Sequence, residues 1–535
     1  MEEQKNQKQS MMTPTHYLRV EGVNLSHFVF DTRDLSTTRG AGLLLLNAVD
    51  EVITALGDNS LSGTFKTLSR GASMGLFALD CKDTASVLAK VKEALGTGIF
   101  AHATFVVDLI KANGNYVQEI ESLIAANRWR QMQAASLAVP PANAEVGLPK
   151  PACDLDGLRP AMLGQNGSHT LRGEKLSDAT WERRKYGSEQ KKSFYKEATR
   201  LDGHTDLDLP DFAEHFEEIC KGSKQLEGKL AVFYADGNNF GSKQAKHCDT
   251  PEKQVAFDEY IRGARRKFLR EFLEDAVRHE EWKGKRKNGK DDEYMRFETL
   301  LWGGDELMFV MPAALGWQFA ATFFEKLHGL NLQQTNSGFP DEPLTHAAAL
   351  VFCQHHSPIH RIKKLAKEQM AEFAKGIEEN GNKIGRQRDS MVVVALESFD
   401  HLGAGFEGAM KRRYNEVVPL ESMILADPNG GDFGAYLKKL ANDFKLLRES
   451  ETFPRSQLRS LVNEMIAKEV KDLAAFTDGK DENGNAIKFP PRHFRNTTKE
   501  EKTFLHGTML DHFHKNPAVL WLQLEELWDY ALPRK

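Results

Sequence analysis

Two largely apolar runs, residues 295–302 and 307–311, are separated by only the four residues Gly-Gly-Asp-Glu at 303–306. This spacing predicts two antiparallel strands joined by a tight glycine turn. The hairpin constrains the fold more than any other feature, because it needs a sheet to join and places two acidic residues at that sheet's edge.

The elements around this hairpin follow the order strand, helix, strand, strand, helix, strand, and this order occurs twice. The first copy consists of the expected strand 17–23, helix 40–56, strands 65–68 and 72–79, helix 84–95 and strand 104–110. The second consists of strand 230–234, helix 254–277, strands 295–302 and 307–311, helix 317–330, strand 346–353, helix 358–375 and strand 391–396. The predicted class is therefore α+β, with two ferredoxin-like units.

Composition shifts mark the boundaries between these units. The stretch 134–173 is rich in Pro, Gly, Ala and Asn, and helical periodicity prevails after residue 397, for example at 436–447 and 456–474, interrupted by the turn-rich stretch 477–485. The division that we expect is a disordered leader 1–16, a first domain 17–140, a linker 141–227, a second domain 228–400 and a helical C-terminal domain 401–535.

The composition is that of a globular protein of 535 residues with 71 basic and 76 acidic residues, a net charge of -5. No bulk attraction to nucleic acid or anionic membranes follows, so any polyanion site must be local. Five scattered cysteines, never spaced as C-x-x-C, argue for a reducing compartment. The polar start of the chain has no apolar signal segment, so we expect a cytoplasmic protein that does not contact a membrane.

Residues 181–200 hold seven basic and three acidic side chains interleaved with aromatic residues. Such a segment can lie along a phosphate backbone, or it can form an ordinary solvated helix face.

The acidic residues near the two expected strand ends form the strongest chemical signal. Asp236 follows strand 230–234, while Asp305 and Glu306 belong to the hairpin turn. Mg²⁺ prefers carboxylate oxygens, and two such ions can hold the attacking and leaving oxygens of a displacement. An ordinary acidic turn remains the alternative. Gly303 and Gly304 would give a nucleotide room to approach.

The sequence also resembles a known family in several places. Residues 303–307 (GGDEL) resemble the hairpin of GGDEF nucleotide cyclases, and 234–241 (YADGNNFG) look like the large polymerase-like subunit of type III CRISPR effector complexes. Residues similar to that subunit, in the same order, are 33–46, 153–161 with 183–187, and 355–376. The resemblance covers most of residues 17–400.

This resemblance implies two palm domains, of which the second joins ATP units through 3′-5′ linkages into cyclic oligoadenylate, with release of pyrophosphate. It implies Mg²⁺ or Mn²⁺ as cofactor, ATP as substrate, and RNA and small CRISPR subunits as partners. The residues carried over are the metal ligands and catalytic residues Asp236, Asp305 and Glu306, and the nucleotide-binding residues Gly237, Asn238, Asn239, Gly303, Gly304 and Lys375.

The sequence departs from the family in three respects. Only 16 residues precede Tyr17, where relatives often carry a nuclease domain with a His-Asp motif. Of the paired zinc cysteines only Cys153 remains, with Asp156, Ser177 and Thr180 near the places of its partners, so we expect no zinc. The first copy has neither acidic motif, and we expect it to be structural or to accept a nucleotide.

Three functions stay open from the residues. The leading hypothesis is a nucleotidyltransferase in antiviral defence. A non-catalytic nucleotide-binding scaffold of an RNA-guided complex is the alternative, and a diguanylate cyclase is the third. The histidines His355, His356 and His360 could hold a metal, or they could cap the junction between a strand and a helix.

Overall fold

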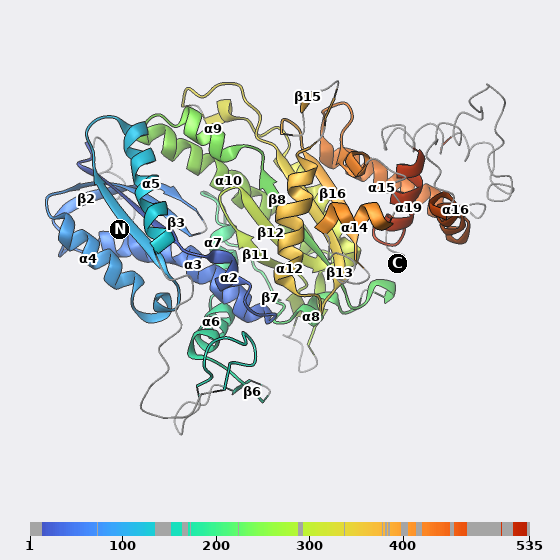
Figure 1. The fold of residues 1–535 in the computed structure, drawn as a ribbon, viewed down its shortest axis with the longest axis horizontal. Helices are drawn as coiled ribbons and strands as arrows, with labels where there is room; N and C mark the ends of the chain where they lie inside the picture. The colour runs from blue at the N-terminus through green and yellow to red at the C-terminus, as the bar shows by residue number, and fades with distance from the viewer. Residues whose placement is uncertain are drawn as a thin grey trace.

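The computed structural model describes residues 13–71, 73–133, 151–162, 170–171, 173–222, 224–286, 293–335, 337–376, 378–379, 382–383, 386–396, 405–413, 420–449, 454–467, 504 and 517–531. Most of the expected leader, much of the Pro-rich stretch and the turn-rich stretch 477–485 lie outside these residues. Figure 1 shows two sheets side by side, the first in blue and the second in green and yellow, with the orange and red C-terminal helices beyond the second.

The first sheet has the strand order β2-β3-β1-β4, and every neighbouring pair is antiparallel. Its elements are β1 (His16–Gly22), α2 (Leu25–Val29), α3 (Leu35–Leu56), β2 (Gly63–Arg70), β3 (Met74–Cys81), α4 (Thr84–Leu95), β4 (Phe105–Lys111) and α5 (Tyr116–Gln133). The expected β-α-β-β-α-β order is therefore present. Helices α3 and α4 start where Asp34 and Asp83 accept hydrogen bonds from backbone amides of their first turns.

The second sheet repeats this order as β11-β12-β8-β13 and extends it with β16 and β17. Its elements are β8 (Lys229–Gly237), α9 (Phe240–His247), α10 (Pro251–Ala276), β11 (Glu298–Trp302), β12 (Glu306–Pro312), α11 (Gly316–Leu327), β13 (His346–Gln354), α12 (Ile359–Lys364), the π-helix η7 (Leu365–Ala371), α13 (Glu372–Ala374), β16 (Ser390–Ala395) and β17 (Leu425–Ala426). β16 is parallel to β13, as a connection through a helix requires.

One expected strand of this sheet is wrong in extent. The run 295–302 divides into β10 (Glu293–Met295) and β11, because the amide of Arg296 donates to the carbonyl of Trp282 and its side chain donates to Ile219. β10 joins a separate sheet with β7 (Asp211–Phe212) and β9 (Lys283–Lys285).

The two faces of the second sheet are covered by different helices. Phe233 of β8 and Phe309 of β12 contact aromatic residues of α11, and Phe309 also contacts Phe268 of α10. Successive side chains along a strand point to opposite faces of the sheet. Asp236 comes three residues after Phe233, and Glu306 comes three residues before Phe309, so both carboxylates point to the face opposite these aromatic rings. That face is covered by the helical run α12, η7 and α13 (Figure 1).

Helix α3 joins the first half of the chain, which carries the first sheet, to the second half, which carries the second sheet. Arg39 on α3 is buried and donates from Nε to Glu298 of β11 at 2.9 Å, and Glu298 is buried as well. Gly40 lies so close to helix α6 (Asp178–Glu189) that an added Cβ would stand 1.7 Å from the carbonyl oxygen of Arg183. The first half is thus fixed against the strand that leads into the acidic hairpin.

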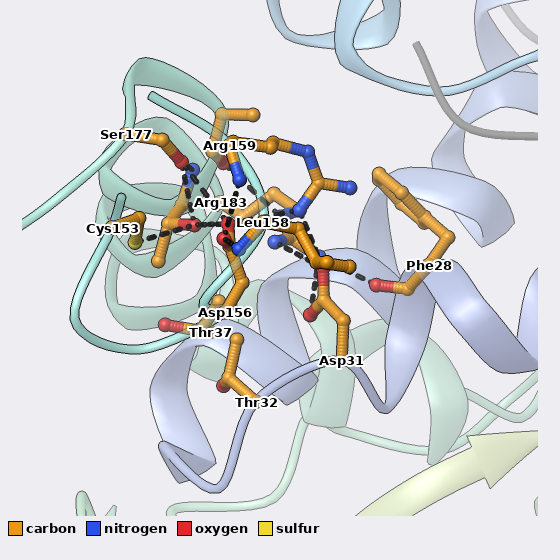
Figure 2. A network of polar contacts seen from close by, with 12 residues as sticks. Phe28, Asp31, Thr32, Thr37, Cys153, Asp156, Leu158, Arg159, Ser177 and Arg183 are labelled. Atoms are coloured by element: carbon orange, nitrogen blue, oxygen red, sulfur yellow. Dashed lines mark hydrogen bonds and ion pairs between the residues drawn. The ribbon is translucent and has the colours of Figure 1, made fainter. Parts of the chain in front are cut away.

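The linker is organised by a buried polar network rather than by solvated charges (Figure 2). Asp31, before α3, pairs with Arg183 at 2.9 Å and with Arg159 at 2.6 Å. Asp156 accepts from Arg159 at 3.0 Å and from Thr180 at 2.8 Å. Both arginines are almost fully buried, so these residues of the linker are tied to the start of α3.

The network also contains the four residues near the expected places of zinc ligands, which are Cys153, Asp156, Ser177 and Thr180. Hydrogen bonds join them to one another: Ser177 to Thr180 at 2.8 Å, Ser177 to Asp156 at 3.3 Å and Cys153 to Thr180 at 3.6 Å.

The basic segment 181–200 forms α6 and α7 (Lys191–Ala198). Both alternatives offered for it are wrong for Arg183 and Lys191, because these side chains are buried in ion pairs with Asp31 and Asp211. Its aromatic residues Phe194 and Tyr195 are buried in the core rather than exposed for stacking.

Beyond residue 404, the described residues form mostly helices, besides the short strand β17. These helices are α14 (Gly405–Arg413), α15 (Phe433–Glu449), α16 (Arg455–Ala467) and α19 (Pro517–Leu527). Gly434 lets α15 approach α11 closely, and Trp317 donates to the carbonyl of Leu437 at 3.1 Å. Glu526 of α19 accepts from the amide of Ala395 at the end of β16. None of the helices in the described ranges has the length and apolarity needed to cross a lipid bilayer.

The Arg39 and Glu298 pair yields a stability prediction. Glu298→Met leaves the Arg39 guanidinium buried without its carboxylate, and we expect a loss of about 3–5 kcal/mol in the free energy of unfolding. The double variant Arg39→Met with Glu298→Met should recover most of this loss, because no buried charge remains. Urea-induced unfolding of the three proteins measures both differences. A single variant as stable as the wild type would contradict the assignment.

Candidate functional site

Asp236 and Glu306 stand directly opposite each other on neighbouring antiparallel strands. Asp236 lies near the end of β8, Glu306 is the first residue of β12, and the strand register pairs them. Directly opposed residues share one face of a sheet, so both carboxylates lie on the face covered by α12, η7 and α13. Asp236 and Glu306 therefore lie together at the same end of two neighbouring strands, as the sequence predicts.

The hairpin turn depends on one glycine for its shape. The Gly303 amide donates to the carbonyl of Glu306 at 2.8 Å, and an added Cβ would stand 2.8 Å from that same oxygen. Gly304 is exposed and has open space around the position of a Cβ. Gly303 is therefore needed for the turn, while Gly304 leaves the turn unobstructed. The carbonyl of Asp305 accepts from the Gly237 amide at 3.0 Å, which joins this turn to the end of β8.

Two lysines from the covering helical run reach the paired carboxylates. Lys375 Nζ lies 2.5 Å from Asp236 Oδ2 and 2.6 Å from Glu372 Oε1. Lys367 of η7 forms an ion pair with Glu306.

A third lysine, Lys363 of α12, is buried nearby. Its ammonium lies 4.5 Å from the Phe30 ring centroid, and burial lowers its pKa to about 8.

Asp305 carries the most perturbed carboxyl group of the hairpin. Burial raises its pKa to about 6, and the charges of Asp236 and Glu306 contribute further in the same direction. Burial also raises the pKa of Asp236, against the opposing effect of Lys375. The three carboxylates therefore repel one another in a partly buried place, which is the electrostatic situation that a bound cation relieves.

The loop after β8 is held by hydrogen bonds of its own. Asn238 is buried, and its amide group donates to Thr345 Oγ1 at 3.0 Å and to the carbonyl of Arg388 at 3.2 Å. Asn239 adopts a left-handed conformation with φ of 59° and accepts from Arg386 at 3.0 Å. Gly237 has no room for a Cβ, because the Phe240 ring would lie 2.6 Å away. The contacts observed for these three residues thus fix the loop beside Asp236.

A cleft of about 390 Å³ lies on the other side of the hairpin, between the two halves of the chain. Its lining includes Arg70 and Gly71 of the first sheet, the base of the hairpin at Trp302, and residues of α3, α7 and α10. Asp258 of α10 accepts from the amide of Arg70 at 3.1 Å and from Ser69 Oγ at 3.0 Å. The β2–β3 turn is thereby held beside α10, facing the same cleft as the acidic hairpin.

The cleft has an excess of basic residues. Besides Arg70 it is lined by Arg262, Arg265 and Arg266 of α10, against the acidic residues Asp50 and Glu197. Arg265 is only 6% exposed, its guanidinium lies 5.4 Å from the Trp302 ring centroid, and its Nε and Nη1 atoms have no hydrogen-bond partner among the described residues. Burial lowers the pKa of Arg265 to about 10. A buried guanidinium with unused donors favours an anionic ligand.

Sequence reasoning missed the basic residues that surround the acidic hairpin. The sequence predicts an apolar core stripe along helix 254–277, and the buried residues of α10 form one. Arg265, four residues after Ile261, lies within this stripe. A charged residue at a core position was the available signal. Lys363 and Lys367 are four residues apart on one helix face, a second signal that was not used.

His355 and His356 lie between β13 and α12, and His360 lies within α12. The capping alternative is wrong, because α12 begins after Pro358 with no side-chain hydrogen bond to its first turn. His355 Nδ1 lies 3.0 Å from the carbonyl oxygen of Gly228, and its ring lies 3.6 Å from the ring of His356. Across the described segments, no group of three or more His, Cys, Asp or Glu side chains is arranged as a preformed metal centre.

Comparisons with known proteins find matches among solved structures. No family model and no curated protein matches the chain. The solved structures that match are those of Csm1 (Cas10) of type III CRISPR Csm complexes, the family whose motifs the sequence resembles.

One of these is Csm1 in T. onnurineus, with 13% identity and a TM-score of 0.41, covering 97% of this chain and 70% of that chain. Csm1–Csm4 cassettes in complex with cA4 and with pppApApA match at 12% identity with TM-scores of 0.42 and 0.46, and with the same coverage. At this identity and these TM-scores, no activity or ligand of this chain follows from the likeness.

The raised pKa of Asp305 predicts a pH-dependent stability. In the unfolded chain this carboxyl ionises near pH 3.8, whereas in the folded protein it ionises near pH 6, so its stabilising contribution is complete below pH 3.8 and is lost as the pH rises through 6. Asp305→Asn removes the charge, and we expect it to raise the free energy of unfolding at pH 8 by about 1–2 kcal/mol. The gain should disappear at pH 4.

Denaturant unfolding in EDTA at pH 8 and pH 4 measures this difference. Asp80→Asn, at an exposed position of β3, is the control for the loss of one carboxylate. An equal effect of Asp305→Asn at both pH values would contradict the assignment.

Proposed function

We propose that the protein is a metal-dependent nucleotidyltransferase that joins nucleoside triphosphates, with ATP as the substrate, into cyclic oligoadenylate and releases pyrophosphate. The observation that carries this proposal is the register that sets Asp236 opposite Glu306, with Asp305 in the adjoining turn. Two sheets with the same strand order suit two palm domains, the second of which carries the acidic residues. A role in CRISPR-type antiviral defence, with RNA and small effector subunits as partners, belongs to the same proposal.

The donor set of the hairpin fits a divalent cation. Asp236, Asp305 and Glu306 supply hard oxygen atoms, and the pKa of Asp305 is raised partly by the charges of the other two. Mg²⁺ is usually held by one or two carboxylates together with waters and substrate phosphates, so a preformed cage of protein ligands is not required. Such an ion, when bound, supplies Lewis-acid activation of a 3′ hydroxyl and of the α-phosphate.

The chain's own cations would hold the triphosphate. Lys375 stands beside Asp236 and can pair with phosphate oxygens once that carboxylate is otherwise neutralised. The exposed Gly304 and the open space around it leave room for the nucleotide over the turn. In the reaction, the 3′ oxygen of one nucleotide attacks the α-phosphorus of another, the bond to the β-phosphate breaks, and pyrophosphate leaves.

The second nucleotide would lie in the basic cleft between the two halves. Arg265 offers unused donors there, and the half-buried ring of Trp302 offers apolar surface for a base. The first half contributes Arg70 and Gly71 of its own hairpin to this cleft. This assigns the first half the nucleotide-accepting role.

Loss of a carboxylate tests the proposed chemistry. We expect Asp305→Ala and Asp236→Asn to lower the rate of pyrophosphate release from ATP by about a hundredfold or more, since even residues that only support metal ligands cost about 10–100-fold. The assay supplies each nucleoside triphosphate with Mg²⁺ or Mn²⁺ and candidate RNA activators. Asp80→Asn should keep the wild-type rate. Full activity in Asp305→Ala, or binding of ATP with no pyrophosphate under any condition, would refute the proposal.

Replacement of the Arg265 guanidinium by an amine tests whether the cleft binds ATP. Hydrogen bonds from a charged donor contribute about 1.5–3 kcal/mol, so Arg265→Lys, which keeps a positive charge but loses the fork, should weaken ATP binding about tenfold. Calorimetry in EDTA measures binding without turnover. Arg278→Lys, an exposed position just beyond α10, is the matched control. Equal affinities of the two variants would exclude Arg265 from the binding site.

A further inference from the structure

The helical run that covers the acidic edge contains an unusual segment. Between α12 and α13 the seven residues of η7 form a π-helix. Such wide turns are rare, and they occur frequently at functional sites. Lys367 lies within this segment, whereas Lys375 directly follows α13.

The wide turn explains how both lysines reach one sheet edge. Two turns of a regular α-helix take about 7.2 residues, so residues eight apart are displaced from a common face. A π-helical turn takes more residues, which brings Lys367 and Lys375 closer to two full turns apart. Their partners, Glu306 and Asp236, are opposed in the register of β12 and β8. Each lysine therefore occupies one member of the carboxylate pair.

The two lysines differ in how firmly they are held. The side chain of Lys375 is 11% exposed and bridges two carboxylates, those of Asp236 and Glu372. The side chain of Lys367 is 39% exposed, and its recorded ion pair is with Glu306, itself 29% exposed. An ion pair at this exposure contributes little to stability. Lys367 is accordingly the one that can leave its carboxylate at little cost.

An anion has a place beside Lys367. A cavity of about 120 Å³ is lined by Lys363, Lys367 and Glu306, together with Ser73 at the β2–β3 turn. Arg39 also lines it, but Arg39 is paired with Glu298. The ion pair of Lys367 with Glu306 lies at the wall of this cavity, and its ammonium becomes available to an anion there when a divalent cation neutralises Glu306.

We propose that Lys367 is a positioning residue that pairs with Glu306 in the cation-free protein, gives up this carboxylate to a divalent cation, and then pairs with a phosphate of the bound nucleotide. The inference rests on the proposed metal-dependent function. It adds a residue and an exchange of partners to that function: Lys367 competes with the cation and assists the nucleotide.

Cation binding without nucleotide tests the competition. Lys367→Met removes the competing charge, and we expect it to bind Mn²⁺ about two- to fivefold more tightly than the wild type, which corresponds to about 0.4–1 kcal/mol. Titration of free Mn²⁺ by electron paramagnetic resonance measures this directly. Lys364→Met is the matched control, because Lys364 lies on the same helical run, is exposed, and carries the same charge. Lys367→Arg should restore the wild-type affinity.

Nucleotide binding supplies the second readout. In saturating Mn²⁺, Lys367→Met should bind a non-hydrolysable ATP analogue about threefold or more weakly than the wild type, with Lys364→Met unchanged. A mere structural role of Lys367 would not tighten one ligand and weaken the other. Equal shifts in Lys367→Met and Lys364→Met, weaker Mn²⁺ binding in Lys367→Met, or no Mn²⁺ binding in either the wild type or Lys367→Met would each overturn the inference.

The outcome is separable from that of the proposed function. Opposite shifts in Mn²⁺ and nucleotide affinity, without pyrophosphate release under any condition, would support the role of Lys367 while refuting the transferase. Pyrophosphate release that depends on Asp305, with Mn²⁺ affinity unchanged in Lys367→Met, would support the transferase while overturning the role of Lys367.

Discussion

The antiparallel register of β8 and β12 is the constraint on which the site depends. It places Asp236 opposite Glu306 and, by alternation, Phe233 opposite Phe309 on the other face. A slip of one residue would turn the aromatic side chains out of the core and the carboxylates into it. Burial of the aromatic face against α10 and α11 is therefore what fixes the acidic pair.

The first half of the chain is held to this sheet by interactions of a different kind. α3 meets α6 where Gly40 and Gly187 leave no space for side chains, and the buried Arg39 pairs with Glu298 on β11. Close backbone contact is nonspecific, whereas a buried ion pair tolerates only one alignment, because misalignment leaves a charge unpaired. The alignment brings the β2–β3 turn beside α10, and this creates the basic cleft between the halves.

Much of this could be predicted from the sequence. The hairpin at 303–306 and the repeated order of strands and helices follow from apolar periodicity and glycine placement, and both are present. The resemblance in motifs also pointed to Lys375, which the structure places on Asp236. The roles of Asp236, Asp305 and Glu306 themselves stay predictions. The local pattern of apolar residues and glycines is enough to predict a strand, helix or turn whose formation depends mainly on its own residues.

The rest could not be predicted, because it depends on contacts between distant segments. The charges of residues 181–200 give no sign that Arg183 is buried against Asp31, 152 residues away. The spacing of Cys153, Asp156, Ser177 and Thr180 gives no sign of the hydrogen bonds that join them. Nor does a periodic apolar helix at 358–375 reveal a π-turn. In each case the partner, not the local pattern, determines what the residue does.

The distribution of charge around the hairpin explains why a chain with a net charge of -5 can offer a polyanion site. Asp236 pairs with Lys375 and Glu306 pairs with Lys367, so these opposing charges cancel within a small volume. The arginines of the cleft stand on the other side of the same turn. In the proposed function, a cation added to the carboxylates would free the lysines for phosphate, and the arginines already have unused donors at Arg265. Cation and polyanion binding would then reinforce each other through charges that are local, and the net charge of the chain would have little influence on either.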